Sequence, residues 1–273
     1  MGLAIKGKKV IGLALNGKKI LGEAKNGKVI WRFINSKSWK FAADKYVMSV
    51  AVDSSGNVYA GTYSNGNSVY KLDISGTQVW KFSADDIVQS VAVDSSGNVY
   101  AGTAGHSVYK LNASGTQVWK FAAYNYVHSV AVDSSGNVYA GTSGNSLYKL
   151  DASGTQVWKF TADDTVQSVA VDSSGNVYAG TTGHSVYKLD ASGNPAWQFT
   201  ADNWVESVAV DSSGNVYAGT AGHSVYKLDA SGNQVWHFTA DGDVYGVAVD
   251  SSGNVYAGTD SSSVYKLTPD GSN

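Results

Sequence analysis

The chain of 273 residues lacks cysteine, has only two prolines, and carries a charged fraction of 15%. Without cysteine it can form no disulfide, thiolate nucleophile or cysteine-ligated zinc site. The shortage of proline excludes collagen-like and proline-rich chains, and 43% apolar residues exclude a disordered one. No run approaches the roughly 18 apolar residues of a membrane span, and the N-terminus has no signal-peptide core. We therefore expect a folded protein made without Sec export and not inserted into a membrane.

A long repeat dominates the sequence. The string Val-Ala-Val-Asp-Ser-Ser-Gly-Asn-Val-Tyr-Ala-Gly-Thr occurs six times, and its aspartates are Asp53, Asp94, Asp133, Asp172, Asp211 and Asp250. The first interval is 41 residues and the other four are 39. A second marker, Trp-x-Phe, recurs at the same intervals at Trp39, Trp80, Trp119, Trp158, Trp197 and Trp236. A fixed period of this length indicates six copies of one supersecondary unit.

Each unit has the pattern of four short strands. In the second unit these strands, a to d, are Val88–Val93, Val99–Gly102, Ser107–Leu111 and Gln117–Phe121. Apolar and polar residues alternate within them, and Gly, Asn, Asp and Ser separate them, which is typical of strands and hairpins. No helical period occurs. Six four-stranded units of about 40 residues predict an all-β fold, a six-bladed β-propeller.

The two ends of the repeat array predict that the propeller is closed. The last unit stops after Val264–Leu267 and has no strand d, whereas Trp39–Phe41 precedes the first strand a. Pairing these segments would complete the sixth blade and remove exposed sheet edges. We therefore expect residues 37–273 to form a six-bladed propeller closed by an N-terminal strand. Trp39→Ala should then lower the free energy of unfolding more than Trp204→Ala.

The repeats resemble known propeller families. Residues 147–160, Leu-Tyr-Lys-Leu-Asp-Ala-Ser-Gly-Thr-Gln-Val-Trp-Lys-Phe, resemble the PQQ-like repeat, and the Val-Ala-Val-Asp-Ser-Ser-Gly-Asn string is similar to NHL and SBBP repeats. This resemblance covers residues 39–267 and implies the propeller fold, on which many functions occur. Quinone-dependent members of the PQQ-like family have more blades and dedicated cofactor contacts that we cannot place here, so we expect no cofactor.

Residues 1–36 form a separate, basic segment with a repeat of ten residues. Asn16-Gly17 and Asn26-Gly27 are strong hairpin signals, because both central residues of a type I′ turn need positive φ. Eight Lys and one Arg face one Glu in the first 38 residues, a net charge of +8, whereas residues 39–273 carry −10. We predict a small β-hairpin-repeat arm that serves anchoring or oligomerisation, which makes a second copy of the chain a candidate partner.

The partner of this arm stays open between two interpretations. Lysines blunt exposed strand edges and keep a small β element soluble, or they bind an anionic surface. Nucleic acid is disfavoured because the arm has a single arginine, Arg32, beside Trp31 and Phe33. The tandem Asn-Gly-Lys units ending in Val-Ile-Trp resemble N-terminal modules of tail-associated proteins of phages and prophages of Gram-positive bacteria. That resemblance implies attachment to virion or tail components and release by lysis; the alternative location is the cytoplasm.

Differences among the units point to a binding surface. The turn between strands a and b is the same in all six units, and variation gathers in the d–a and b–c loops. The d–a loop and the start of strand a contribute Tyr46, Met48, Gln89, Tyr126, His128, Gln167, Trp204, Glu206, Asp243 and Tyr245. The b–c loop adds Tyr63, His106, Asn145, His184 and His223. We predict that they ring one mouth of the central channel and bind a sugar or peptide. The alternative is that these loops vary without function.

The repeated motifs themselves indicate structure rather than chemistry. Asp-Ser-Ser-Gly-Asn lacks the alternating acids and distal Glu of a calcium loop, and an Asx-turn explains it without metal. His106, His184 and His223 lie on different units, so we expect no metal site. Asp85-Asp86 and Asp163-Asp164 read as solvated turn carboxylates. No nucleophile elbow, phosphate loop or zinc motif occurs.

These observations predict a non-enzymatic binding protein. Its partner would be a bacterial surface glycan or a protein receptor, and the context suggested by the arm is a phage or prophage tail. The alternative is a structural or protein–protein interaction scaffold with no small ligand. An enzyme is the least supported class, since it would need carboxylate pairs around Glu206 and Asp243.

Overall fold

The computed structural model describes residues 3–5, 8–15, 18–25, 28–33, 39–43, 46–63 and 67–273, with the backbone alone before residue 34. Contacts divide the chain into two compact units, Met1–Phe41 and Ala42–Asn273. The sequence placed the boundary slightly earlier, between residues 36 and 37. All regular structure in the described residues is β-strand, so none of them belongs to a helix able to span a membrane.

The first unit is a four-stranded antiparallel meander in the order β1-β2-β3-β4. Its strands are β1 (Leu3–Ile5), β2 (Lys8–Leu15), β3 (Lys18–Lys25) and β4 (Lys28–Phe33). Leu15 pairs with Lys18 and Lys25 pairs with Lys28, as the two predicted hairpins require. The Asn-Gly pairs at 16–17 and 26–27 lie outside the described residues.

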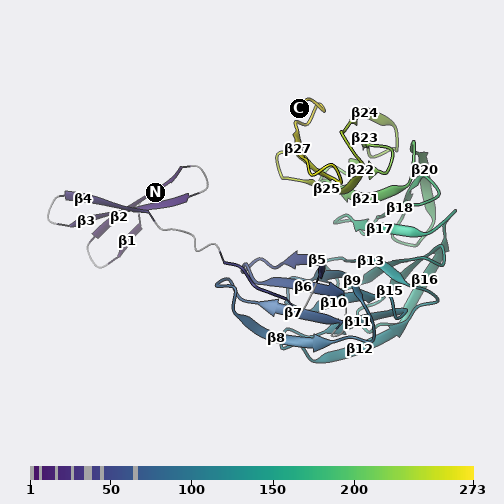
Figure 1. Cartoon of the computed structure of the whole chain (residues 1–273), viewed down its shortest axis with the longest axis horizontal. Coiled ribbons are helices and arrows are strands. Elements are labelled where there is room, and N and C mark those ends of the chain that lie inside the picture. Colours follow the sequence, from purple (N-terminus) through teal and green to yellow (C-terminus); the bar gives the residue numbers. More distant parts are fainter. Residues whose placement is uncertain are drawn as a thin grey trace. The chain divides into compact units, whose positions relative to one another are not determined.

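The second unit contains six antiparallel sheets that follow one another around an arc (Figure 1). The first three are β5 (Tyr46–Val52), β6 (Val58–Tyr63), β7 (Ser68–Leu72), β8 (Gln78–Ser83); β9 (Val88–Val93), β10 (Val99–Thr103), β11 (Ser107–Leu111), β12 (Gln117–Ala122); and β13 (Val127–Val132), β14 (Val138–Thr142), β15 (Ser146–Leu150), β16 (Gln156–Thr161). The next three are β17 (Val166–Val171), β18 (Val177–Thr181), β19 (Ser185–Leu189), β20 (Pro195–Thr200); β21 (Val205–Val210), β22 (Val216–Thr220), β23 (Ser224–Leu228), β24 (Gln234–Thr239); and β25 (Val244–Val249), β26 (Val255–Thr259), β27 (Val264–Leu267). The predicted all-β architecture of repeated four-strand units is confirmed for the first five sheets.

The Asp-Ser-Ser-Gly-Asn string that repeats in each unit forms a turn, and its own side chains stabilise that turn. In the third sheet, Asp133 Oδ1 accepts the N–H groups of Ser135 and Asn137, both at 2.9 Å. Its Oδ2 accepts Asn137 Nδ2 at 2.8 Å and the Tyr139 hydroxyl at 3.0 Å. Gly136 has φ +79°, a conformation that residues with a Cβ rarely adopt. The predicted Asx-turn is present, and every carboxylate oxygen in it has a partner.

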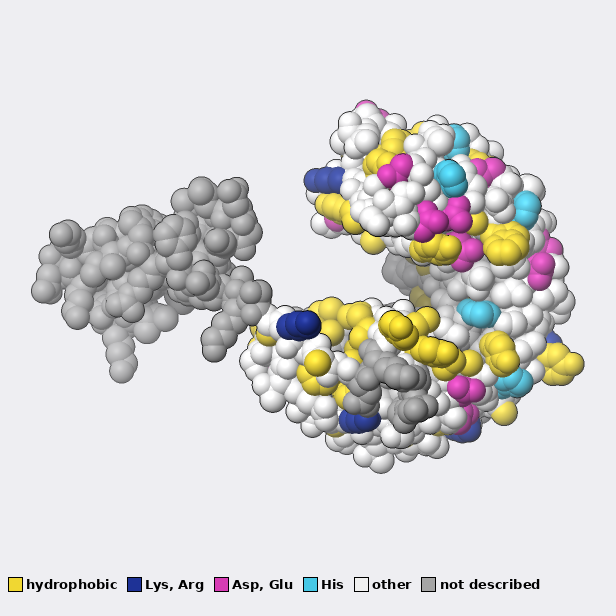
Figure 2. Space-filling view, viewed as in Figure 1, with side chains coloured by type: hydrophobic (Ala, Val, Ile, Leu, Met, Phe, Trp, Pro, Cys, Tyr) yellow, Lys and Arg dark blue, Asp and Glu magenta, His cyan; other side chains and the backbone are white. Residues whose placement is uncertain are grey.

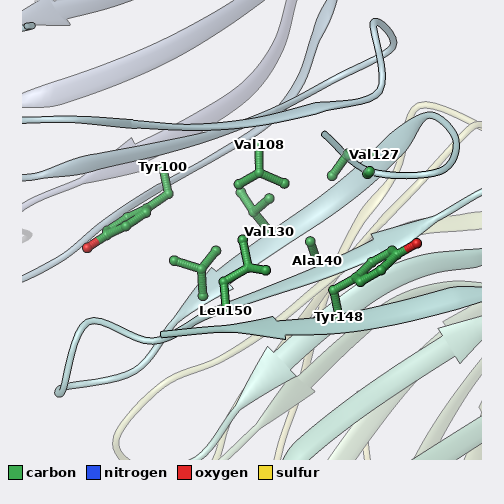
Figure 3. Close-up of a cluster of buried hydrophobic side chains, with 9 residues drawn as sticks. Tyr100, Val108, Val127, Val130, Ala140, Tyr148 and Leu150 are labelled. Carbon is green, nitrogen blue, oxygen red and sulfur yellow. The ribbon is translucent and has the colours of Figure 1, made fainter. Parts of the chain in front are cut away.

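The hydrophobic core lies between successive sheets rather than within one. One cluster joins Tyr100 and Val108 of the second sheet to Val127, Val130 and further residues of the third (Figure 3). Gly102 allows this close approach, because a Cβ there would lie 2.6 Å from Val127 Cγ1. The remaining neighbouring pairs of sheets repeat the arrangement, so each sheet buries its face only by stacking on the next.

The Trp-x-Phe motif fastens each sheet to the following one. Trp119 Nε1 donates to the carbonyl of Ala152 at 3.1 Å, and its ring covers Gly154, where a Cβ would lie 2.7 Å from Trp119 Cδ2. Phe121 meets Tyr148 of the next sheet edge-on, with ring centroids 5.5 Å apart. These contacts pack each sheet against the next.

Closure of the six sheets is the part of the expected fold that the structure does not have. The sixth sheet has three strands in the order β25-β26-β27, and residues 39–43 adopt no strand. Val264 in β27 is 80% exposed, whereas its counterparts in the five other sheets are fully buried. The predicted pairing of Trp39–Phe41 with Val264–Leu267 is therefore not found, and this sheet has no fourth strand among the described residues. Pairing complementarity alone does not close a ring, because the angle at which sheets stack must also be right.

Candidate binding face

The turns and loops of the second unit lie on two opposite faces. Trp80 Nε1, at the start of a strand d, donates to Ala113 O in the next c–d turn. On the other side, Ala123 N of a d–a loop donates to His106 O of a b–c loop at 2.7 Å. We call the side of the a–b and c–d turns the turn face. The side of the b–c and d–a loops, which carries the varying residues, is the variable face, and histidine and hydrophobic side chains are exposed along it (Figure 2).

Six of the candidate residues occupy a β-bulge at the start of strand a. In the third sheet Val127 pairs with Thr142 and Ser129 with Gly141, so His128 between them has no partner across the ladder. The same irregularity places one residue of every sheet at a bulge: Met48, Gln89, His128, Gln167, Glu206 and Tyr245. Simple two-residue alternation of side chains along a strand does not hold here. A bulge redirects its side chain, and bulges are common beside functional sites.

Several candidate residues are brought together in pairs. Tyr46 and Tyr63 have ring centroids 6.1 Å apart within the first sheet. His106 of the second sheet lies against Tyr126 of the third at 5.2 Å. Tyr126 and Trp204 are each about half exposed, at 48% and 51%. These exposed rings lie at strand ends or in the residue just before a strand.

The backbone constrains the b–c loop residues that the sequence singled out. His106, Asn145, His184 and His223 all have positive φ, between 55° and 66°. Asn and His are enriched in this conformation relative to most residues with a Cβ. Turn geometry therefore explains part of the recurrence of His at this position. The sequence pattern alone predicts that these histidines bind a ligand.

The fifth and sixth sheets give one end of the variable face an acidic character. His223 Nε2 lies 3.3 Å from Asp243 Oδ1, and Asp260 Oδ1 accepts the N–H of Asp243 at 3.0 Å. Burial, together with the nearby charge of Asp243, raises the pKa of Glu206. The two carboxylates that an enzyme would need are thus electrostatically coupled, but one of them is engaged with His223.

His128 is part of a small polar contact in the third sheet. Its Nε2 lies 2.6 Å from Ser143 Oγ in the adjacent b–c loop. Burial lowers the pKa of His128 and favours the neutral ring. A neutral imidazole and a hydroxyl can each donate and accept, which suits recognition of a polar ligand.

Aspartates of the d–a loop have a structural role that the sequence analysis missed. Asp85 Oδ1 accepts the hydroxyl of Thr103 at 2.9 Å, Oδ2 accepts that of Ser107 at 2.5 Å, and Lys120 Nζ lies 2.9 Å from Oδ2. Burial alone would raise the pKa of Asp85, but these hydrogen bonds and Lys120 hold it below its ordinary value. Asp163, Asp202 and Asp241 accept the equivalent pairs of Thr and Ser hydroxyls. The position of Lys120 is occupied by Gln198 in the fourth sheet and by His237 in the fifth, so the lysine contact is not repeated there. These aspartates hold together the two ends of the b–c loop. The sequence feature that could have revealed this role is the Thr and Ser that recur on either side of each loop.

Three cavities among the described residues lie on the turn face. One of about 450 Å³ lies between the a–b turns of the fifth and sixth sheets and is lined by Ser212, Lys227, Ser252 and Pro269, among others. Two smaller ones, of about 210 and 200 Å³, occupy equivalent positions between other neighbouring sheets. Their linings are mostly the repeated turn residues. In the first cavity Pro269 replaces the alanine that the four preceding units have at this position.

Within the described part of the chain, no three His, Asp or Glu side chains are grouped so as to hold a metal ion. The carboxylates of the a–b turns are occupied by Asn, Tyr and backbone N–H groups. Burial alone would raise the pKa of Asp94, but these hydrogen bonds keep it below its usual value. The charge is therefore stabilised by protein donors.

The fold and this surface define a repeat protein built of stacked, propeller-like β-sheets. Three overlapping matches, over residues 16–124, 65–182 and 150–273, place it in the PQQ-like repeat family described as outer membrane protein assembly factor BamB, and the chain belongs to that family. Among solved structures it is similar to the computationally designed Ika8 protein, with a TM-score of 0.75 and 13% identity. That match covers 100% of this chain and 84% of the other and reflects fold alone. No curated protein matches the chain.

Proposed function

We propose that the protein is a binding scaffold without catalytic activity and that its ligand contacts the variable face. The carrying observation is the contrast between two surfaces of the same sheets. The turn-face residues repeat and are held by internal hydrogen bonds, whereas the variable-face residues differ and are partly exposed at bulges and loop tips.

The ligand class that fits best is a glycan of a bacterial surface. Exposed rings at Tyr46, Tyr126 and Trp204 can cover the apolar face of a sugar. Polar groups at neighbouring bulges, such as Gln89, Gln167 and His128, can bind its hydroxyls. Spaced from sheet to sheet, these groups favour an extended polymer over a small molecule.

A protein partner is the second candidate, and the family relation favours it. The family is described as an assembly factor, which supports a role in holding other proteins. In that case the same rings would act as interface anchors, as Tyr and Trp commonly do. We further propose that the basic N-terminal unit provides attachment, in a virion or tail if the chain is phage-derived.

The test compares Tyr126→Ala, Trp204→Ala and the control Val118→Ala on a glycan array and in pull-downs from bacterial envelope. Val118 is 54% exposed on the strand β12 and is equally exposed in its counterparts. We expect the two ring variants to lose at least tenfold in affinity and to melt within about 2 °C of the wild type, because exposed substitutions change stability little. Unaltered binding in both ring variants would contradict the proposed surface, and capture of protein rather than glycan would favour the second candidate.

A further inference from the structure

The two ends of the sheet array expose faces that are buried everywhere else in it. On the first sheet, Val47 is 47% exposed and Val50 is 56% exposed. Their counterparts in the third sheet, Val127 and Val130, are 0% and 6% exposed because the second sheet covers them. The first sheet therefore presents an apolar surface shaped to receive a preceding sheet.

The sixth sheet presents the matching surface. In the five other sheets a glycine of strand b faces the next sheet: a Cβ on Gly61, Gly102, Gly141, Gly180 or Gly219 would lie 2.6 Å from a valine Cγ1 of the next sheet. Gly258 occupies this position in β26, and nothing lies within 4 Å of a Cβ built there. In the internal interfaces this space is filled by the first valine of strand a of the next sheet, such as Val88 or Val127. Val47 is the equivalent valine of the first sheet.

The missing fourth strand belongs to the same surface. In the second sheet, Val108 of strand c pairs with Phe121 of strand d, and Lys110 pairs with Trp119. The same register on β27 would pair Val264 with Phe41 and Lys266 with Trp39. Trp39–Phe41 precedes the first strand of the first sheet by only a few residues along the chain, so the chain is long enough for this segment to reach β27 when the first sheet lies against Gly258.

We propose that the sixth sheet of one molecule stacks on the first sheet of a second copy of this chain, with the partner's Val47 against Gly258. The partner's Trp39 and the partner's Phe41 then add the fourth strand to β27. A second copy engages both faces without altering any of the five formed interfaces, whereas mating within one molecule would require the array to change shape, because nothing lies within 4 Å of a Cβ at Gly258. The two faces differ, so the association is head-to-tail and leads to a ring of copies or an open helical assembly.

One residue weakens this junction relative to the internal ones. In each of the five internal interfaces a serine hydroxyl accepts a backbone N–H of the next sheet, as Ser129 Oγ does from Val169 N at 3.0 Å. The sixth sheet has Gly246 at this position and so lacks the hydroxyl. The junction between copies is therefore expected to be weaker than any internal interface and to depend on protein concentration.

Sedimentation velocity of the full chain over a range of concentrations tests the association. We expect wild-type molecules to associate and Val47→Glu to remain monomeric. Val79→Glu is the matched control, because Val79 is 54% exposed on an outer strand and is exposed in its counterparts as well. It should associate as the wild type does. Gly246→Ser should lower the dissociation constant by about tenfold, the worth of one added hydrogen bond.

A mixing experiment separates association between molecules from closure within one. Gly258→Val should be tolerated in the monomer, where its side chain meets open space, and should block the junction. Val47→Glu keeps an intact sixth sheet and Gly258→Val an intact first sheet, so mixing the two monomeric variants should give a 1:1 dimer and nothing larger. The proposal is overturned if the mixture stays monomeric, or if wild type is monomeric at all concentrations and Val47→Glu instead lowers its melting temperature, which would indicate closure within one chain.

Discussion

The third and sixth sheets share almost the same sequence but differ in what covers them. Gly141 in the third sheet faces Val166, which a Cβ would approach to 2.6 Å, whereas the equivalent Gly258 faces open space. Tyr139 is fully buried, while Tyr256 at the equivalent position of the sixth sheet is only partly so. Burial in this fold is thus set by position in the array and by the neighbouring sheet. Stability then approximates a sum of unit and nearest-neighbour terms.

The largest expected change in stability comes from substituting the strand-b glycine, which is covered in the third sheet and uncovered in the sixth. Gly141→Val would place a side chain on Val166 Cγ1 and within 2.9 Å of the Val166 carbonyl oxygen, so we expect a loss of about 3 kcal/mol or more in the free energy of unfolding. Gly258→Val should change it by less than about 0.5 kcal/mol in the monomer. Urea denaturation at low protein concentration measures both. Equal losses would show that the sixth sheet is covered in solution.

Loss of an inter-sheet tryptophan comes next. Trp119→Ala removes the ring over Gly154 and the hydrogen bond to Ala152 O, and we expect a cost of about 2–3 kcal/mol. Trp204→Ala, on the variable face, should cost under about 0.5 kcal/mol. Trp39→Ala in the same series tests the sequence-based expectation that this position costs more than Trp204. A similar loss at Trp119 and Trp204 would contradict the division between packing and surface tryptophans.

The a–b turns predict sensitivity to acid. Hydrogen bonds led by that of Asn254 lower the pKa of Asp250 to about 2, below the value of about 3.8 expected for an unfolded chain. A folded pKa below the unfolded one stabilises the fold above about pH 4, and this contribution is lost as pH falls towards 2. Asp172 is the equivalent aspartate in the fourth sheet. Asp172→Asn should cost about 1.5 kcal/mol in the free energy of unfolding at pH 7 and flatten the acid limb of a stability–pH curve. An unchanged acid limb would mean that these turns do not drive acid unfolding.

The serine between sheets should have a smaller effect. Ser129→Ala leaves the N–H of Val169 without its acceptor, and we expect a loss of about 1 kcal/mol. Gly246→Ser, at the uncovered sixth sheet, should leave the unfolding of the monomer nearly unchanged. Chemical denaturation of the pair shows whether the hydroxyl matters only where a following sheet covers it.

The smallest effect is expected at Glu206. Burial first, and the charge of Asp243 second, raise its pKa, so ionised Glu206 opposes folding once the pH exceeds its unfolded value. Glu206→Gln should therefore raise the melting temperature slightly at pH 7 and have no such effect near pH 4. Destabilisation at pH 7 would show that the carboxylate has a favourable partner.

Local structure was predictable from this sequence because each turn is specified by its own residues. Asp94, Gly97 and Asn98 form the expected Asx-turn, and the alternation around Val108 and Tyr109 forms a strand. The bulge at Gln89 could not be found this way, since it depends on how Thr103 and Gly102 pair across the ladder. The role of Asp85 was missed for a similar reason, because its partners follow it by 18 and 22 residues. Closure depends on stacking angles, which no single residue encodes.

The serine-to-backbone bond between sheets gives the array a direction. In every internal interface the hydroxyl comes from the earlier sheet and the N–H from the later one. Two identical ends therefore cannot mate, and any added sheet must enter in the same orientation. A gain or loss of one whole repeat would preserve every junction. The number of sheets is thus a property that evolution can change in integer steps without redesigning a single interface.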